Sequence, residues 1–252
     1  MVGSAYDNTM QPPPEQNQGM PPSTSGPVSF DALTNAFKVL QSDFGYWALA
    51  SLIILAVAGV TYVIAMFIAA ALGLGAGLAA SASRTSATAA VSLPMMLVGY
   101  MLAMVLIIAV SYALFAGYLD VAVRRIGGQK TAINDLFVGF KKVGPLITAG
   151  LVIGLCSTIG MYLCVIPGLY LAAAWSLTPL LILRQNLAPF DAMKKSMSLI
   201  NSSSPVMMVL LLFVASICAE LGAIACGIGM LFTFAIYPLT IGFVYRGFFP
   251  TE

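Results

Sequence analysis

Six apolar runs occupy most of this chain of 252 residues and restrict its fold more than any other feature. A helix needs about 20 apolar residues to cross the hydrocarbon core of a bilayer. The runs that reach or approach this length are residues 47–71, 94–118, 145–164, 169–183, 205–225 and 230–248. Only 8% of the residues are charged, against roughly 25% in soluble domains, so the chain could not cover a water-facing surface. The sequence therefore predicts an all-α integral membrane protein with six transmembrane helices.

The segments between these runs predict how the six helices are connected. Residues 72–92 are rich in Gly and Ala, and we expect them to form an external connection after the first span. Pro167-Gly168 separates the third and fourth runs, and Gly227 and Gly229 separate the fifth and sixth. These connections are very short, so each of the last two pairs of spans is expected to form an antiparallel hairpin.

The basic residues predict the orientation of these spans. Ten of the eleven fall in segments that the six spans place on one side, and only Arg84 falls on the other. Connections rich in Lys and Arg face the cytoplasm. We therefore expect both termini in the cytoplasm. The ten residues are Lys38, Arg124, Arg125, Lys130, Lys141, Lys142, Arg184, Lys194, Lys195 and Arg246.

The chain divides into a tail and a membrane domain. Residues 1–27 are rich in Pro, Gln, Ser and Gly and contain no apolar core of the kind a signal peptide needs. Such a composition cannot bury enough apolar surface to fold, so we expect a disordered cytoplasmic tail. Residues 28–252 are expected to form the six-span domain.

Three connectors share one apolar pattern, with residues at offsets 0, 3, 7 and 10. This spacing places an apolar stripe on one face of a helix, and polar residues occupy the other face. We expect three amphipathic helices in the cytoplasmic interface, with their lysines toward lipid phosphates. The alternative is that any short amphipathic connector shows this pattern. The stripes are Phe30, Leu33, Phe37 and Leu40; Ile133, Leu136, Phe140 and Val143; and Phe190, Met193, Met197 and Ile200.

Several short motifs carry a resemblance to a bacterial family. They are Asp135-Leu136-Phe137 with Phe140-Lys141, the run Cys164 to Leu171 that reads CVIPGLYL, Trp175, Pro179-Leu180, and Asp191-Ala192 with Ser196. In these motifs the chain resembles the membrane domain attached to some glycerophosphodiester phosphodiesterases and related multi-spanning proteins, over residues 30–248. The resemblance implies a six-span helical domain in the bacterial cytoplasmic membrane. It implies no reaction, because the catalytic domain of the fused members is a separate soluble barrel.

Composition argues against several classes of function. The chain contains no histidine, the commonest general base and metal ligand. The four cysteines lie in apolar stretches without the spacing of a redox or metal motif, so we expect buried packing residues. The net charge of +2 is too small to indicate nucleic acid binding. We expect no enzyme activity, no metal and no cofactor.

Glu220 is the acidic residue that lies deep inside a predicted span. A charge at membrane depth costs at least ~2.5 kcal/mol, so this carboxyl group should be protonated, paired or exposed to water. One interpretation is a proton or cation site in a polar cavity. The other is a structural hydrogen bond between helices, or a position near the external headgroups.

The basic pairs on the predicted cytoplasmic side are candidate contacts for anionic lipid, at about 1 kcal/mol for each charge. They also serve as markers of orientation, and the sequence does not separate the two roles. These interface features favour a structural or accessory scaffold that contacts lipids and partner membrane proteins. The alternative is a small transporter or channel that uses Glu220, and a membrane enzyme is third. The candidate contacts are Arg124, Arg125, Lys141, Lys142, Lys194 and Lys195.

Overall fold

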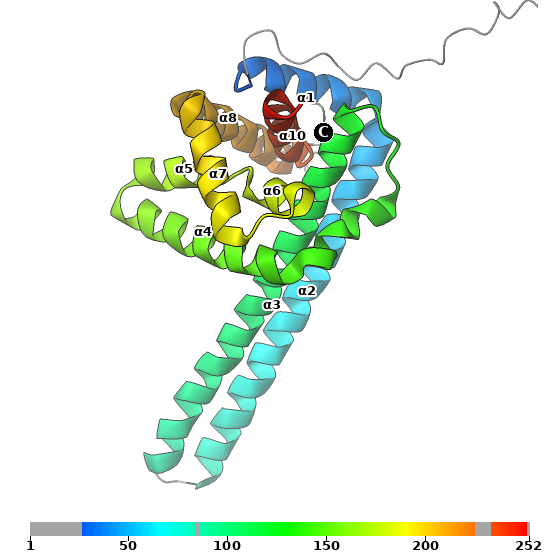
Figure 1. Ribbon diagram of the computed structural model, residues 1–252. Helices are drawn as coiled ribbons and strands as arrows, with labels where there is room; N and C mark the ends of the chain where they lie inside the picture. The colour runs from blue at the N-terminus through cyan, green and yellow to red at the C-terminus, as the bar shows by residue number, and fades with distance from the viewer. Residues whose placement is uncertain (1–26, 84–85, 225–232, 251–252) are drawn as a thin grey trace, which may run out of the picture.

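The computed structural model describes residues 27–83, 86–224 and 233–250 (Figure 1). Every regular element in these residues is helical. The elements are α1 (Phe30–Ser42), α2 (Phe44–Ser83), α3 (Ser86–Ile126), the 3₁₀ helix η1 (Ile133–Lys142), α4 (Val143–Leu163), α5 (Val165–Ala174), α6 (Thr178–Gln185), α7 (Pro189–Ser202), α8 (Pro205–Ile224) and α10 (Ile236–Phe248). The predicted tail falls outside the described residues except for Pro27.

The two longest helices, α2 and α3, form a hairpin. They contain 40 and 41 residues, so each is about 60 Å long, twice the thickness of the hydrocarbon core. Residues 72–83 and 86–92 continue α2 and α3 as helix, so the prediction that the first helix ends near residue 71 is wrong. Alanine is the strongest helix former and is abundant there, which explains the extension.

The remaining helices gather around one end of this hairpin, the end that carries Arg124 and Arg125 (Figure 1). Helices η1, α4, α6 and α10 all contact α3, and α10 also contacts α1 and α8. In Figure 1, α4 and α5 run across the direction of the hairpin instead of alongside it. The far half of the hairpin extends away from this group, and the exposed side chains there include Val63 and Phe67.

Four segments are long and apolar enough to cross a membrane, as a multi-spanning helical protein requires. They are Phe44–Leu72, Leu97–Ile126, Ile133–Leu163 and Val165–Gln185. A fifth is obtained if α7 and the first part of α8, which meet at a bend of 103°, count as one broken span. Helix α10 contains only 13 residues, and residues 230–232 of the predicted sixth run are outside the described part. The count of six therefore stays a prediction.

The break between α4 and α5 lies at Cys164, and not at the predicted Pro167-Gly168. Cys164 has an extended backbone, with φ −166° and ψ 128°, between the two helices. Pro167 is the third residue of α5, where proline is tolerated because the first turn has no internal acceptor for its N–H. Gly168 allows the hairpin to close, because a Cβ atom there would lie 2.6 Å from the backbone nitrogen of Met161. The predicted tight hairpin is confirmed, with its turn three residues earlier.

Helices occupy all three connectors that carry the apolar pattern, namely α1, η1 and α7. The buried face of α1 is formed by Ala32, Ala36, Val39 and Leu40, while Phe30 is 44% exposed. In α7, Met193 and Ile200 are buried and Phe190 is exposed. The predicted stripe is therefore divided, since part of it packs inward and its first aromatic residue faces outward. The location of these helices in the membrane interface stays a prediction.

The middle connector, η1, packs with its backbone directly on α3. A Cβ atom on Gly117 of α3 would lie 1.9 Å from the carbonyl oxygen of Leu136, and one on Gly139 would lie 1.9 Å from the carbonyl oxygen of Ala113. No side chain fits at either point. Helix η1 is thus part of the packed body of the protein on this side, although Phe137 and Phe140 remain exposed on its other side.

Candidate functional site

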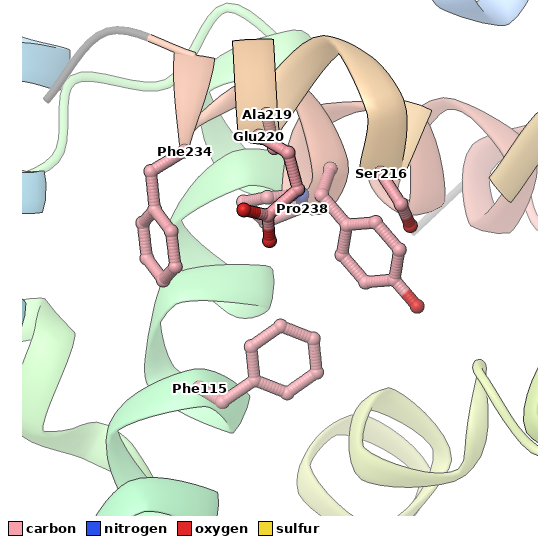
Figure 2. A pocket seen from close by; sticks show the side chains of 7 residues that line it. Phe115, Ser216, Ala219, Glu220, Phe234 and Pro238 are labelled. Carbon is pink, nitrogen blue, oxygen red and sulfur yellow. The ribbon is translucent and has the colours of Figure 1, made fainter. Parts of the chain in front are cut away.

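Glu220, the predicted intramembrane site, lies on α8 at the edge of a cavity of about 210 Å³. Figure 2 shows its carboxyl group pointing into the cavity, with the Phe234 ring to one side and the Phe115 ring below. Phe115 comes from α3, so the cavity lies between elements that are far apart in the sequence. Its lining residues are Phe115, Ser216, Ala219, Glu220, Phe234, Tyr237 and Pro238.

The Glu220 carboxylate has no hydrogen-bond or ion-pair partner among the residues that the structure describes. The Ser216 hydroxyl in the same lining donates to the carbonyl oxygen of Leu212, at 2.8 Å. The carbonyl oxygen of Ala219 accepts from the Thr233 hydroxyl, at 2.9 Å. The Ser216 and Thr233 hydroxyls are therefore engaged with the backbone, and the carboxylate faces the cavity, open to a proton, water or a ligand. The predicted hydrogen bond between helices is not found in the described part of the chain.

A second cavity of about 320 Å³ lies against the first. Phe115 and Phe234 line both cavities, so the two spaces adjoin at these residues. The Phe234 ring stacks on Tyr118, with centroids 6.0 Å apart, and the Phe115 ring lies 6.2 Å from that of Tyr237. The rest of the second lining is mainly apolar and comes from α2 and α3: Ile54, Leu55, Ala58, Ser111, Leu114 and Tyr118.

Polar contacts lead from the second cavity toward the basic end of the hairpin. The Tyr118 hydroxyl is 2.8 Å from the Ser51 hydroxyl, and both residues are buried. Further along, Tyr46 accepts a hydrogen bond from the Thr131 hydroxyl at 3.0 Å. Arg125 donates to Thr131 at 2.9 Å and lies over the Tyr46 ring, 3.4 Å from its centroid. These contacts join the start of α2 to the end of α3.

Most of the predicted lipid-contacting groups make contacts within the protein. Arg124 pairs with Asp120, with Nε 2.7 Å from Oδ2, and Arg125 pairs with Asp43. Both arginines therefore carry neutralising partners, which reduces the charge that they offer to a lipid phosphate.

Of the four lysines predicted to contact lipid, two make hydrogen bonds within the protein. Lys142 donates to the carbonyl oxygens of Ile182 and Leu183, at 2.9 and 3.0 Å, and so caps the C-terminal end of α6. Lys195 donates to the Gln185 side chain at 2.6 Å. In the described residues, only Lys141 and Lys194 of this set are exposed and without such a partner.

Asp120 is a polar residue of α3 that the sequence reasoning missed. Its side chain is 3% exposed and lies between two arginines, Arg124 on the same helix and Arg184 on α6. The Arg184 Nε is 2.8 Å from Asp120 Oδ1, and Arg246 lies near enough to Arg184 for their charges to repel. A signal was present, because an acid four residues before an arginine on a helix indicates an ion pair.

The described residues contain no group of three or more Cys, Asp or Glu side chains that could hold a metal ion. Comparison of the chain with known protein families, with characterised proteins and with solved structures finds no match. The fold defines the class of the protein as an all-helical protein with four segments, or five with the bent pair, that are long and apolar enough to cross a membrane. The family resemblance noted above rests on its sequence motifs alone.

Proposed function

We propose that this protein is a six-span carrier or channel of the bacterial cytoplasmic membrane, with both termini in the cytoplasm, that moves a small cation through the Glu220 cavity. The observation that supports this proposal best is a carboxylate that points into a cavity between α3, α8 and α10 and has no partner among the described residues. It favours the transporter hypothesis over a structural hydrogen bond between helices, because such a bond needs a partner for Glu220 and the described residues supply none. A catalytic role has no second convergent acid to support it in the described lining.

The depth of the cavity supports this proposal. Phe115 precedes Arg124 by nine residues on α3, which is about 13 Å along the helix axis. If Arg124 lies at the level of the headgroups, Phe115 and the Glu220 carboxyl group lie close to the middle of a core about 30 Å thick. Transporters place their substrate and ion sites near this midplane. A charge there costs ~2.5–3.5 kcal/mol or more, so a bound cation or proton would stabilise the site.

Flux in reconstituted vesicles tests the proposal. The purified full chain is inserted into liposomes that contain a pH-sensitive dye, and proton flux is followed after a membrane potential is imposed. We expect flux with the wild type and a loss of at least tenfold in Glu220→Gln. Asp191→Asn is the matched control, since Asp191 is an exposed carboxylate in the first turn of α7, outside the cavity. Equal flux in Glu220→Gln would contradict the proposal, and so would wild-type vesicles that move neither protons nor an added small cation.

A lipid-contacting scaffold is the second candidate, and the outward-facing aromatic residues of the connectors favour it. Phe30 and Phe190 are 44% and 56% exposed, and the exposed lysines Lys141 and Lys194 lie on the same set of connectors. The test is the amount of anionic lipid that co-purifies with the protein in detergent. Replacement of both lysines by Gln should lower the amount of anionic lipid that co-purifies, while replacement of Asp191 by Asn should not.

The proposed orientation is tested by labelling single cysteines in intact cells. Cysteines are introduced at positions 84 and 130 in a chain whose own four cysteines are replaced by Ala. A membrane-impermeant maleimide should label position 84 and should not label position 130, which lies in the exposed segment after α3. Labelling of position 130 without labelling of position 84 would contradict the orientation.

A further inference from the structure

We infer that the cation taken by the Glu220 cavity is a small organic ammonium ion and not a metal ion. This inference rests on the proposed function and names the chemical class of its substrate. It is carried by the aromatic side chains that surround the carboxylate, which come from two parts of the chain more than 100 residues apart.

Three aromatic rings line the cavity beside the carboxylate: Phe115 of α3, Phe234, and Tyr237 of α10. The face of an aromatic ring attracts a cation through its quadrupole, and several rings together bind alkylated ammonium groups. Figure 2 shows the Glu220 carboxyl group in the same cavity as the Phe234 and Phe115 rings, so a cation held at the carboxylate lies in an aromatic surrounding. A carboxylate supplies the charge, and the rings supply contact with methyl or methylene groups.

The described lining is poor in the oxygen ligands that metal ions need. Calcium takes six to eight oxygen ligands, and magnesium demands a near-octahedral set. The side chains here that carry oxygen are Glu220, Ser216 and Tyr237. A metal ion would therefore have to keep most of its hydration shell. An organic ammonium ion has a weaker shell and apolar substituents that the rings can desolvate.

The size of the cavity restricts the ligand to a small one. Its volume of about 210 Å³ is below the 300–1,000 Å³ of sites for drug-sized ligands. The neighbouring cavity of about 320 Å³ lies behind the shared rings of Phe115 and Phe234. A compact ion such as tetramethylammonium, with one charge and four methyl groups, has the chemistry and the scale of the first cavity.

Binding of tetramethylammonium to the purified full chain in detergent tests the inference, with isothermal titration calorimetry at a constant total salt concentration. We expect saturable binding by the wild type, with loss of binding in Glu220→Gln. Phe234→Leu removes one ring and should weaken binding roughly 2- to 30-fold, the range expected for one cation–π contact. Phe234→Tyr retains the ring and should bind within about threefold of the wild type, and Asp191→Asn should bind equally well. Gel filtration and circular dichroism check that each variant is folded.

Three outcomes would overturn the inference. The first is that the wild type does not bind tetramethylammonium although Glu220-dependent proton flux is observed; the ligand class is then wrong and the proposed function stands. In the second, tetramethylammonium binds equally well to Glu220→Gln, which means that the site lies elsewhere. The third is equal affinity of Phe234→Leu and Phe234→Tyr, which excludes the aromatic contact. Binding without any flux would support the ligand class and contradict transport.

Discussion

The ion pairs around Asp120 predict an unequal dependence of stability on three charged side chains. Asp120 is 3% exposed in its side chain, Arg184 is 14% exposed and Arg124 is 34% exposed. The free-energy cost of losing a partner rises with burial, because a stranded charge in a dry environment has no water to solvate it. Arg124 and Arg184 pair with the same carboxylate, that of Asp120, so the loss of stability on replacing each residue can be compared within one network.

Removing the carboxylate should have the largest effect. Asp120→Ala leaves the Arg184 guanidinium, whose side chain is 14% exposed, without this carboxylate, and we expect a loss of about 3–5 kcal/mol in the free energy of unfolding. Arg184→Ala still leaves Asp120 paired with Arg124, so it removes one charge-assisted hydrogen bond, at about 1.5–3 kcal/mol. Arg124→Ala removes a half-exposed pair within one helix, at about 0.3–1 kcal/mol.

Equilibrium unfolding in mixed detergent micelles, followed by circular dichroism, measures these differences. The double variant Asp120→Ala with Arg184→Leu should be more stable than Asp120→Ala alone, because it removes the stranded charge and fills its space with an apolar side chain. If Arg124→Ala destabilises the protein as much as Arg184→Ala, burial does not decide the cost. Strictly additive effects in the double variant would also refute the reasoning.

Three further predictions concern packing and hydrogen bonds, and the same unfolding measurement checks all of them. Gly139→Ala places a methyl group against the backbone of α3 and should cost about 1–3 kcal/mol or more, whereas Gly154→Ala, where the space is open, should be neutral or stabilising by up to about 1 kcal/mol. Lys142→Met leaves two carbonyl oxygens of α6 uncapped and should cost about 1.5–3 kcal/mol. The adjacent and exposed Lys141→Met is its control and should change stability by less than about 0.5 kcal/mol; equal effects of the two would contradict the capping role. Tyr118→Phe removes a buried hydroxyl pair and should cost about 1 kcal/mol; no measurable loss would show that the pair contributes nothing.

The features that could be predicted from sequence depend on local patterns. The apolar runs predict a multi-spanning helical protein, and the described residues form helices that include four segments long and apolar enough to cross a membrane. The apolar stripes that begin at Phe30 and Phe190 predict two amphipathic helices, and α1 and α7 occupy these segments. These features follow from periodicity and short-range spacing, which a single sequence contains.

The features that were missed depend on contacts between distant residues. Hydropathy does not show that α2 continues beyond residue 71, because a segment rich in Ala and Gly is compatible with a connection as well as with a helix. The turn at Cys164 is fixed by the approach of Gly160 to Gly168, which no local motif marks. The prediction therefore placed the break at Pro167, although the break lies at Cys164.

The candidate site shows the same division. Glu220 could be found as an acid in an apolar run, but its neighbour Phe115 lies on another helix, and nothing in the sequence pairs them. Asp120 was missed because it follows the apolar run directly and adjoins the arginines that mark orientation. The role of Lys142 could not be predicted because its acceptors belong to α6, about 40 residues away in the chain.

The reciprocal glycine contacts between α3 and η1 have a consequence for synthesis. They join positions only about 20 to 25 residues apart in the chain, and contacts of such short separation form early. A chain grows from its N-terminus, and its parts fold as they emerge. Helix η1 can therefore dock on α3 before α4 to α10 have left the ribosome. The later helices, with Glu220 on α8, would then insert against a surface that is already assembled, and a larger residue at Gly117 or Gly139 would lower the yield of folded protein as well as its stability.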